Sequence, residues 1–343
     1  MHFKTNEPVY KQVADLLRRD IASGRLSDKI PGERELSTHY GVNFKTANKA
    51  VSTLVEKGLL ARIRGKGTFV ARGGKRTKLE TIGLLVPQLQ NPYFAKCVEA
   101  IERAATKAGI SVLLNTTHSP RDAGRFVEAL SHRGAHGLIV NGDPIALRKH
   151  APAFPIVGFG AGTPDSDYVT ADVGEGARLA MEHLIARFGC EIGYIGAVDG
   201  NSDERIQGYR TALAAGRFPV RSQWIQIAAQ DYRGGYSAAK TLLSRKPRPR
   251  SLFVYNDYMA IGAERAIAEL GLRVPGDVAV MGFDDSANPG DMVVPTTSVR
   301  FSYEKLARSL LLLVKRRTQS PDASPRLIHI APKLMVRQST SAK

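Results

Sequence analysis

The sequence has few of the residues that support metal, disulfide or membrane chemistry. Its 343 residues include two cysteines and one tryptophan. Cys97 and Cys190 are too far apart for a CxxC metal or redox motif. No stretch approaches the ~18 apolar residues of a membrane-spanning helix, and the first eight residues lack the apolar segment of a secretory signal. We therefore expect a cytoplasmic protein with no metal, no cofactor and no membrane contact.

The sequence also lacks the residue arrangements that common enzymes need for catalysis. The sequence contains no Ser-His-Asp order, no metal-ligand spacing and no matched pair of carboxylates. The glycine-rich loops at 64–67 and 158–162 do not match the motifs of phosphate-binding or dinucleotide-binding loops. We therefore predict that the chain is not an enzyme. An enzyme acting on sugars is the alternative, and steady release of product from a bound sugar would reveal it.

Positive charge is concentrated near the N-terminus. The net charge is +17, and residues 1–78 hold 17 Lys and Arg against 7 Asp and Glu, a net of +10. Such a concentrated positive field suits a polyanion such as DNA, which is bound largely through counterion release. The remaining +7 is spread over 265 residues and requires no special partner. A chain of this length favours two or three domains.

The basic segment predicts three short helices followed by two strands. Apolar side chains recur at helical spacing in the first and third segments, and β-type segments flank a basic glycine turn. Gly41 ends the second helix, and Asn43 caps the third. This order is that of a winged helix-turn-helix, in which the later helix inserts its first residues into the major groove of DNA. The expected elements cover residues 9–21, 33–40, 43–55, 59–63 and 68–70.

The residues expected to contact DNA lie at the start of the second helix, on the third helix and on the wing. They are Arg34, Asn43, Phe44, Lys45, Thr46, Lys49, Arg64 and Lys66. Lys and Arg at such places either hold phosphates or read guanine edges, and the sequence leaves both roles open. A small helical interaction module with a solvated basic face is the alternative interpretation.

At these residues the segment 8–71 resembles the winged helix-turn-helix domain of the GntR family. The resemblance is carried by three motifs, at 30–36, 42–47 and 65–70. Gly32 stands where the family usually has Ser, and Phe44 stands where it usually has an Arg that reads the operator. The resemblance implies DNA binding, but the usual operator code does not carry over at Phe44. A phenyl ring there can instead contact a thymine methyl group.

The rest of the chain alternates short apolar strands with helices. This rhythm predicts an α/β fold with doubly wound parallel sheets. Some 260 residues exceed the needs of one such sheet, so we expect two lobes with a cleft between them. The predicted organisation is a DNA-binding domain at 1–73, a basic glycine-rich linker at 74–80 and an effector-binding and dimerisation domain at 81–343. The expected strands are 82–86, 111–114, 137–140, 156–159, 192–195, 224–227, 251–255 and 278–283.

Polar and aromatic residues follow several of these strands, where open α/β sheets bind their ligands. Arg, Asn and Asp beside aromatic rings suit a polyhydroxylated ligand, because rings stack on sugar C–H faces while planar polar groups bind paired hydroxyls. Arg205 and Asn256 are the strongest candidates from the residues alone. Asp172 is a second candidate that could equally serve as a helix N-cap. Helix capping or packing is an equal alternative for Tyr209, Asp257 and Asp285.

This segment resembles the LacI-type sensor, a relative of periplasmic sugar-binding proteins. The resemblance is carried by the segments 91–94, 204–209, 256–262, 271–278, 280–285 and 334–340. It implies a periplasmic-binding-protein-like fold and a dimer, and it places Phe94, Arg205, Tyr232, Asn256 and Asp284 on effector-contact positions. The hinge helix of LacI-type proteins is absent, because the N-terminal domain resembles another family. The layout is similar to that of arabinose repressors.

We therefore interpret the chain as a homodimeric transcriptional repressor. Its partners are a double-stranded DNA operator and a small-molecule effector, for which a sugar is the prediction. The effector would close the cleft and change the spacing of the two DNA-binding domains. One alternative is a sensor that answers to a protein partner instead of a sugar. A transport-type binding protein is disfavoured by the basic N-terminal segment and by the lack of a recognisable signal.

Overall fold

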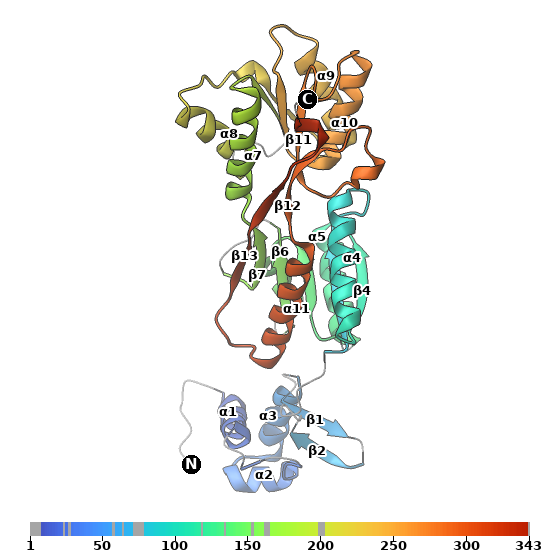
Figure 1. Cartoon of the computed structure of the whole chain (residues 1–343). Coiled ribbons are helices and arrows are strands. Elements are labelled where there is room, and N and C mark those ends of the chain that lie inside the picture. Colours follow the sequence, from blue (N-terminus) through green and yellow to red (C-terminus); the bar gives the residue numbers. More distant parts are fainter. Residues whose placement is uncertain are drawn as a thin grey trace. The chain divides into compact units, whose positions relative to one another are not determined.

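The computed structural model describes residues 8–22, 25–26, 29–56, 59–63, 65–70, 79–117, 119–133, 135–151, 154–160, 165–197 and 203–341. Contacts within the chain divide it into two units, residues 1–78 and residues 79–343. Each unit is described by itself (Figure 1). None of the helices in the described ranges is both long enough and apolar enough to cross a membrane.

Unit 1 has a helical core with a small antiparallel sheet. Helices α1 and α2 both pack against α3, and Lys29 forms an isolated β-bridge to Phe69. Gly41 separates α2 from α3 with a φ of +66°, a left-handed conformation that glycine adopts without strain. Leu17, Tyr40 and Leu54 are buried in the core. The elements are α1 (Val9–Ala22), α2 (Glu33–Tyr40), α3 (Phe44–Glu56), β1 (Leu60–Ile63) and β2 (Gly67–Val70).

Unit 2 consists of two lobes, each built on a six-stranded sheet. In lobe 1 the strand order is β13-β7-β6-β5-β3-β4, and all neighbouring strands are parallel. Its strands are β3 (Thr81–Val86), β4 (Ser111–Thr116), β5 (Leu138–Asn141), β6 (Ile156–Phe159), β7 (Tyr168–Ala171) and β13 (Leu327–Ile330). Its helices are α4 (Pro92–Lys107), α5 (Pro120–His132), α6 (Pro144–Arg148) and α11 (Tyr303–Gln319).

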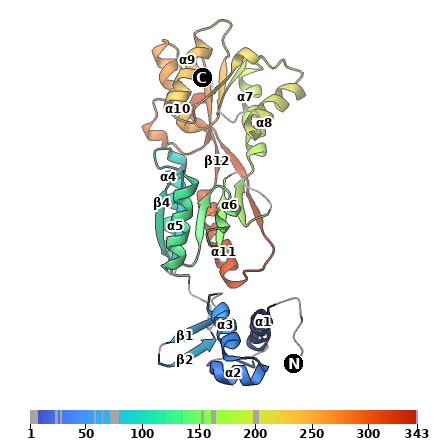
Figure 2. The same ribbon diagram turned by 180° about the vertical axis from the view of Figure 1, so that it is seen from behind.

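Lobe 2 repeats this plan with the order β14-β12-β11-β10-β8-β9. Its neighbouring strands are parallel except for β12 and β14, which pair antiparallel. Figures 1 and 2 show α7 and α8 on one side of this sheet and α9 and α10 on the other. Its strands are β8 (Ile192–Ala197), β9 (Ile225–Ala228), β10 (Ser251–Val254), β11 (Ala279–Asp284), β12 (Thr297–Phe301) and β14 (Pro332–Met335). Its helices are α7 (Val173–Phe188), α8 (Glu204–Ala215), α9 (Tyr232–Leu243) and α10 (Asp257–Glu269).

Three chain connections join the lobes. They follow β7, β12 and β13, and lead into α7, α11 and β14 respectively. Asp172 and Ser302 cap the helices that begin at the first two connections. One hydrophobic cluster includes Val86 of lobe 1 and Phe283 of lobe 2, so apolar packing is continuous across the connections.

The central strands are apolar along their whole length. In β3, β8, β10 and β11 nearly every residue is buried, as expected when helices cover both faces of a parallel sheet. The ends of these strands are therefore where polar side chains can reach solvent, and the predicted effector residues Asn256 and Asp284 lie at the ends of β10 and β11. The expectation of doubly wound, largely parallel sheets in two lobes is confirmed.

Candidate DNA-binding and effector sites

In unit 1 the side chains expected to contact DNA are mostly exposed. Arg34, Lys45 and Lys66 are exposed, and the side chain of Phe44 is 49 % exposed at the first position of α3. Thr46 is half-buried. Arg64 lies outside the described residues, as does most of the predicted linker. The described side chains thus form a basic surface that contains one unburied aromatic ring.

Two of the expected DNA contacts already have partners within unit 1. The Oδ1 atom of Asn43 accepts a hydrogen bond from the N–H of Thr46 at 2.8 Å, which confirms the predicted cap of α3. The Nζ atom of Lys49 lies 4.3 Å from the ring centroid of Tyr10 in α1. A cation–π contact of this kind contributes on the order of 0.5–1 kcal/mol at an exposed site. Both contacts hold side chains on the helix rather than extend them toward a ligand.

Sequence reasoning missed Arg62 of the wing. Its Nη2 atom donates to Glu33 Oε1 at 3.0 Å and also to Asn48 Oδ1. Glu33 begins α2, and Asn48 lies on α3, so Arg62 joins strand β1 to both helices of the helix-turn-helix. The basic residue was visible in the sequence, but its partners are 29 and 14 residues away.

In unit 2, Arg205 is the centre of the predicted effector site. It is the second residue of α8, and its side chain is buried. Its guanidinium carbon lies 4.3 Å from the ring centroid of Tyr255 and 4.3 Å from that of Phe283. Contact between a desolvated cation and an aromatic face contributes roughly 2 kcal/mol. The two rings fix the plane of the guanidinium, so its edge is available for hydrogen bonds.

Two carboxylates contact the same guanidinium. Asp203 caps α8 through the N–H of Arg205, and its Oδ2 atom lies 3.1 Å from Arg205 Nη1. Asp284 Oδ1 lies 3.6 Å from Arg205 Nη2. Among the described residues, the buried Nε atom of Arg205 has no hydrogen-bond partner. An unpaired buried donor is costly, so this N–H can bind an oxygen of a ligand at a net gain.

Burial changes the protonation of the carboxyls at this site. It raises the pKa of Asp284 to about 6, against the opposing attraction of Arg205. Burial and the charge of Asp284 also raise the pKa of Asp257 to about 7. Asp257 accepts hydrogen bonds from the Ser298 hydroxyl at 2.7 Å and from the Ser286 N–H at 2.6 Å. Asp257 thus ties the start of α10 to the segments that follow β11.

Asn256 and Asp172 act as helix caps. Asn256 Oδ1 accepts from the N–H of Met259 at 2.9 Å, and Asp172 Oδ1 accepts from the N–H of Glu175 at 3.0 Å. The capping role weighed for Asp172 is therefore present. Asn256 follows Tyr255 at the end of β10, so the cap is adjacent to the aromatic pair around Arg205.

Phe94 and Tyr232 are half-buried and lie at the starts of helices. Phe94, in α4 of lobe 1, packs against the hydrophobic cluster that includes Phe283. Tyr232 begins α9, where a Cβ atom at Gly262 would lie 2.0 Å from the Tyr232 carbonyl oxygen. Close packing of α10 therefore fixes the position of Tyr232, and any larger residue at 262 would displace it.

The structure brings together two of the predicted effector residues, Arg205 and Asp284, and adds three partners that were not among the predicted effector residues. Asp203 caps α8, Tyr255 follows β10 and Phe283 lies in β11, and all three contact the guanidinium. The sequence did contain a signal for two of them: an aromatic residue stands directly before each of two predicted effector residues, Tyr255 before Asn256 and Phe283 before Asp284. Tyr209 has a packing role: it is fully buried, and its hydroxyl donates a hydrogen bond to the Ile192 carbonyl oxygen at 2.8 Å.

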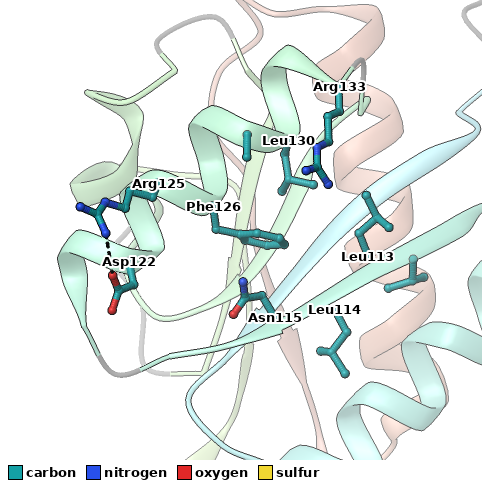
Figure 3. A pocket seen from close by; sticks show the side chains of 10 residues that line it. Leu113, Leu114, Asn115, Asp122, Arg125, Phe126, Leu130 and Arg133 are labelled. Atoms are coloured by element: carbon teal, nitrogen blue, oxygen red, sulfur yellow. Dashed lines mark ion pairs between the residues drawn. The ribbon is translucent and has the colours of Figure 1, made fainter.

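A pocket of about 490 Å³ lies elsewhere, between β4 and α5 of lobe 1 (Figure 3). None of the predicted effector residues lines it. Figure 3 shows Phe126 and Leu130 of α5 facing β4, with the ion pair between Asp122 and Arg125 at one side. Leu113 and Leu114 of the edge strand β4 are 40 % and 41 % exposed. The pocket is therefore an open groove of mixed polar and apolar lining, beside the strand that ends the described sheet of lobe 1. Within the described ranges, no cluster of His, Cys, Asp and Glu suitable for a metal was found.

Comparisons with known families match both units. The model for bacterial regulatory proteins of the gntR family matches residues 9–70, and the model for the periplasmic binding protein-like domain matches residues 181–340. The HTH-type transcriptional repressor PurR of Mannheimia succiniciproducens is 32 % identical over 280 residues, covering 79 % of this chain and 84 % of the relative. PurR of Yersinia pestis is 31 % identical over 283 residues, covering 79 % and 83 %.

Solved structures of regulators share the fold. The transcriptional regulator CelR in complex with cellobiose aligns with a TM-score of 0.68 at 25 % identity, covering 97 % of this chain and all of that one. A ribose-bound LacI family regulator of Enterococcus faecium aligns with a TM-score of 0.67 at 23 % identity, covering 76 % and 99 %. The chain therefore belongs to the LacI family of DNA-binding transcriptional repressors under small-molecule control, and it carries a gntR-family domain at residues 9–70.

Proposed function

We propose that the effector of this repressor is a neutral, polyhydroxylated small molecule of the sugar class, bound around Arg205. The observation that carries the proposal is the guanidinium held between Tyr255 and Phe283, with one buried N–H left without a partner in the described part of the chain. A flat, rigid donor beside carboxylate acceptors suits vicinal hydroxyls. The regulators bound to cellobiose and to ribose support the same ligand class.

The charge balance around Arg205 supports a neutral ligand. Two carboxylates, Asp203 and Asp284, already contact one guanidinium. A phosphate or carboxylate on the ligand would meet this net negative charge in a largely desolvated site, where repulsion is weakly screened. We therefore infer that unphosphorylated sugars bind and that sugar phosphates do not.

The remaining predicted effector residues take supporting roles in this proposal. Phe94 of lobe 1 and Tyr232 of lobe 2 would supply apolar faces, because each is half-buried at the start of a helix. Asp172 and Asn256 would hold the cleft rim through their caps and present their remaining polar atoms to hydroxyls. Closure of the lobes on such a ligand would couple to the DNA-binding domain, with a typical coupling free energy of about 1–3 kcal/mol.

In this proposal residues 1–73 bind the operator, 74–80 act as the linker and 81–343 bind effector and form the dimer. The DNA contacts are the residues predicted from the sequence, with Arg34, Lys45 and Lys66 as the exposed cations. The role is binding rather than catalysis, and its place is the cytoplasm, where the operator lies. The edge strand β4 is proposed as part of the dimer surface, because its outer edge has no neighbouring strand among the described residues and it carries the exposed Leu113 and Leu114.

A thermal-shift screen tests the effector proposal. The purified protein is heated with neutral sugars, sugar phosphates and nucleosides, beside Arg205→Ala and the matched control Arg273→Ala, whose side chain is 81 % exposed. A ligand at about 100 times its dissociation constant should add roughly 2.7 kcal/mol of stability. A shift by a neutral sugar in the wild type and the control, but not in Arg205→Ala, supports the proposal. A shift by sugar phosphates alone contradicts it, and silence across the panel favours control by a protein partner.

A further inference from the structure

Phe44 has an environment unusual for phenylalanine. It is the first residue of α3, its side chain is 49 % exposed, and it does not belong to the hydrophobic cluster that forms the core of unit 1. Because about half of the ring is exposed, it gives up part of the ~1.5–3 kcal/mol that full burial would contribute. The exposed part of the ring therefore adds little to folding.

Helix spacing places Phe44 near the residues that join α3 to the wing. Residues three and four positions apart on a helix are neighbours, so Phe44 lies beside Ala47 and Asn48. Ala47 is buried in the core, and the Asn48 amide is bound by Arg62 of β1. Arg62 also contacts Glu33, the residue before Arg34. Phe44 thus lies on α3 close to the Arg62 bridge, with about half of its surface exposed.

Two polar residues near Phe44, Asn43 and Lys49, already have partners in unit 1, whereas the exposed cations Arg34 and Lys45 have none among the described residues. Asn43 caps α3, and Lys49 lies over the ring of Tyr10. The side chains of Arg34 and Lys45 form no ion pair or hydrogen bond with another described residue, and both are exposed. This surface therefore offers two cations for phosphates or guanine edges and one apolar group, Phe44, but few free amides for reading adenine.

We propose that Phe44 reads thymine in the operator through the C5-methyl group. The thymine methyl is the one apolar feature that the major groove presents, and an exposed phenyl ring is a complementary contact. Arg34 and Lys45 position α3 on the duplex, and Phe44 supplies the choice of base. The proposal rests on DNA binding by unit 1 as stated above, and it identifies the chemistry that the third helix reads.

The test measures the contribution of one methyl group. The full-length protein first selects its preferred sequence from random DNA duplexes. Each thymine of the selected half-site is then replaced in turn by deoxyuridine, which removes the methyl and keeps base pairing. Affinity is measured by fluorescence anisotropy at one fixed salt concentration for the wild type, Phe44→Ala, Phe44→Leu and Val9→Ala. Val9 is an exposed apolar residue on α1 and is the matched control.

The wild type and Val9→Ala should bind about fourfold more weakly when uridine replaces one particular thymine, the effect of losing one buried methyl. Phe44→Ala should bind the two duplexes equally, and Phe44→Leu should keep part of the preference. Thermal melting of the variants checks that unit 1 remains folded. If the wild type shows no methyl dependence at any position, or if Phe44→Ala keeps it in full, the inference is wrong while DNA binding stands. Failure to select any sequence would instead contradict the role assigned to unit 1.

Discussion

The hydroxyl of Tyr303 donates a hydrogen bond to the main-chain oxygen of Asp284 across 2.9 Å, and so joins helix α11 of lobe 1 to strand β11 of lobe 2. Lys96 of α4 donates to the next carbonyl, that of Asp285, at 3.1 Å. Asp284 and Asp285 have φ values of 88° and 50°, a conformation that costs a residue other than glycine about 1–3 kcal/mol. The strained turn that carries Asp284, a carboxylate of the proposed effector site, is therefore held from the opposite lobe.

A double-mutant cycle checks this link between the lobes. Tyr303→Phe and Lys96→Met should each lower the free energy of unfolding by roughly 0.5–1.5 kcal/mol, because each removes one hydrogen bond. The double variant should lose less than the sum, since both bonds hold one turn. Urea unfolding measures the three values. Tyr236→Phe on α9 serves as a distant control, and its effect should add to that of Tyr303→Phe. Strict additivity between Tyr303 and Lys96 would show that the two bonds act independently.

Stability should fall as the pH rises from about 5 to 8. Burial raises the pKa of Asp257 and Glu264 to about 7 and that of Asp284 to about 6, so the folded state binds protons that the unfolded chain releases near pH 4. Their contribution is present below the unfolded pKa and is lost as the pH rises through the folded one. Burial lowers the pKa of His183, which opposes this trend.

Asp257→Asn isolates one carboxyl in this dependence. The amide oxygen can still accept from Ser298, but the side chain no longer ionises. The loss of stability between pH 5 and 8, measured by urea unfolding, should shrink by an amount on the order of a few kcal/mol. Asp322→Asn, at an exposed position, should leave the loss unchanged. An undiminished loss in Asp257→Asn would show that this carboxyl ionises normally in the folded protein.

Arg34→Ala and Lys45→Ala should both weaken operator binding, and salt separates the two kinds of contact. Loss of a base contact costs about 1–3 kcal/mol at the preferred sequence and relaxes specificity. Loss of a phosphate contact weakens all duplexes alike and lowers the salt slope by about 1. Titrations at several salt concentrations measure both quantities. Arg18→Ala, an exposed site on α1, is the control, and an equal effect there would mean that only overall charge matters.

Charge on the edge strand β4 should oppose self-association. Leu114→Lys places a cation in the groove between β4 and α5. A charge on an edge strand opposes its burial against a second copy of the chain. Light scattering should show a lower mass at a given concentration than for the wild type. Leu312→Lys, at a 57 % exposed position on α11, should leave the mass unchanged. A dimer that persists in Leu114→Lys would place the interface on another face.

The DNA-binding unit was largely predictable from local patterns. Helix periodicity, Gly41 as a helix end and Asn43 as a cap are all local signals, and each was confirmed. The bridge made by Arg62 was not predicted, because its partners are distant in the sequence. In unit 2 most of the buried strands followed from their apolar runs. The strands β7, β12, β13 and β14 were not predicted: β7 and β12 are largely buried but mix polar residues into short runs, and β13 and β14 are partly exposed and carry no strong pattern.

The sequence by itself determined the class of protein: the order of helices and wing, the alternation of strands and helices, the basic N-terminal segment and the motif residues are all encoded locally. Tertiary structure alone decided which residues gather at the proposed effector site. Arg205, near the start of the helix that follows β8, meets Tyr255 at the end of β10 and Phe283 at the end of β11, because β8, β10 and β11 are neighbours in one parallel sheet. Parallel neighbours place their carboxyl ends at one edge, and no local pattern can state which strands will be neighbours.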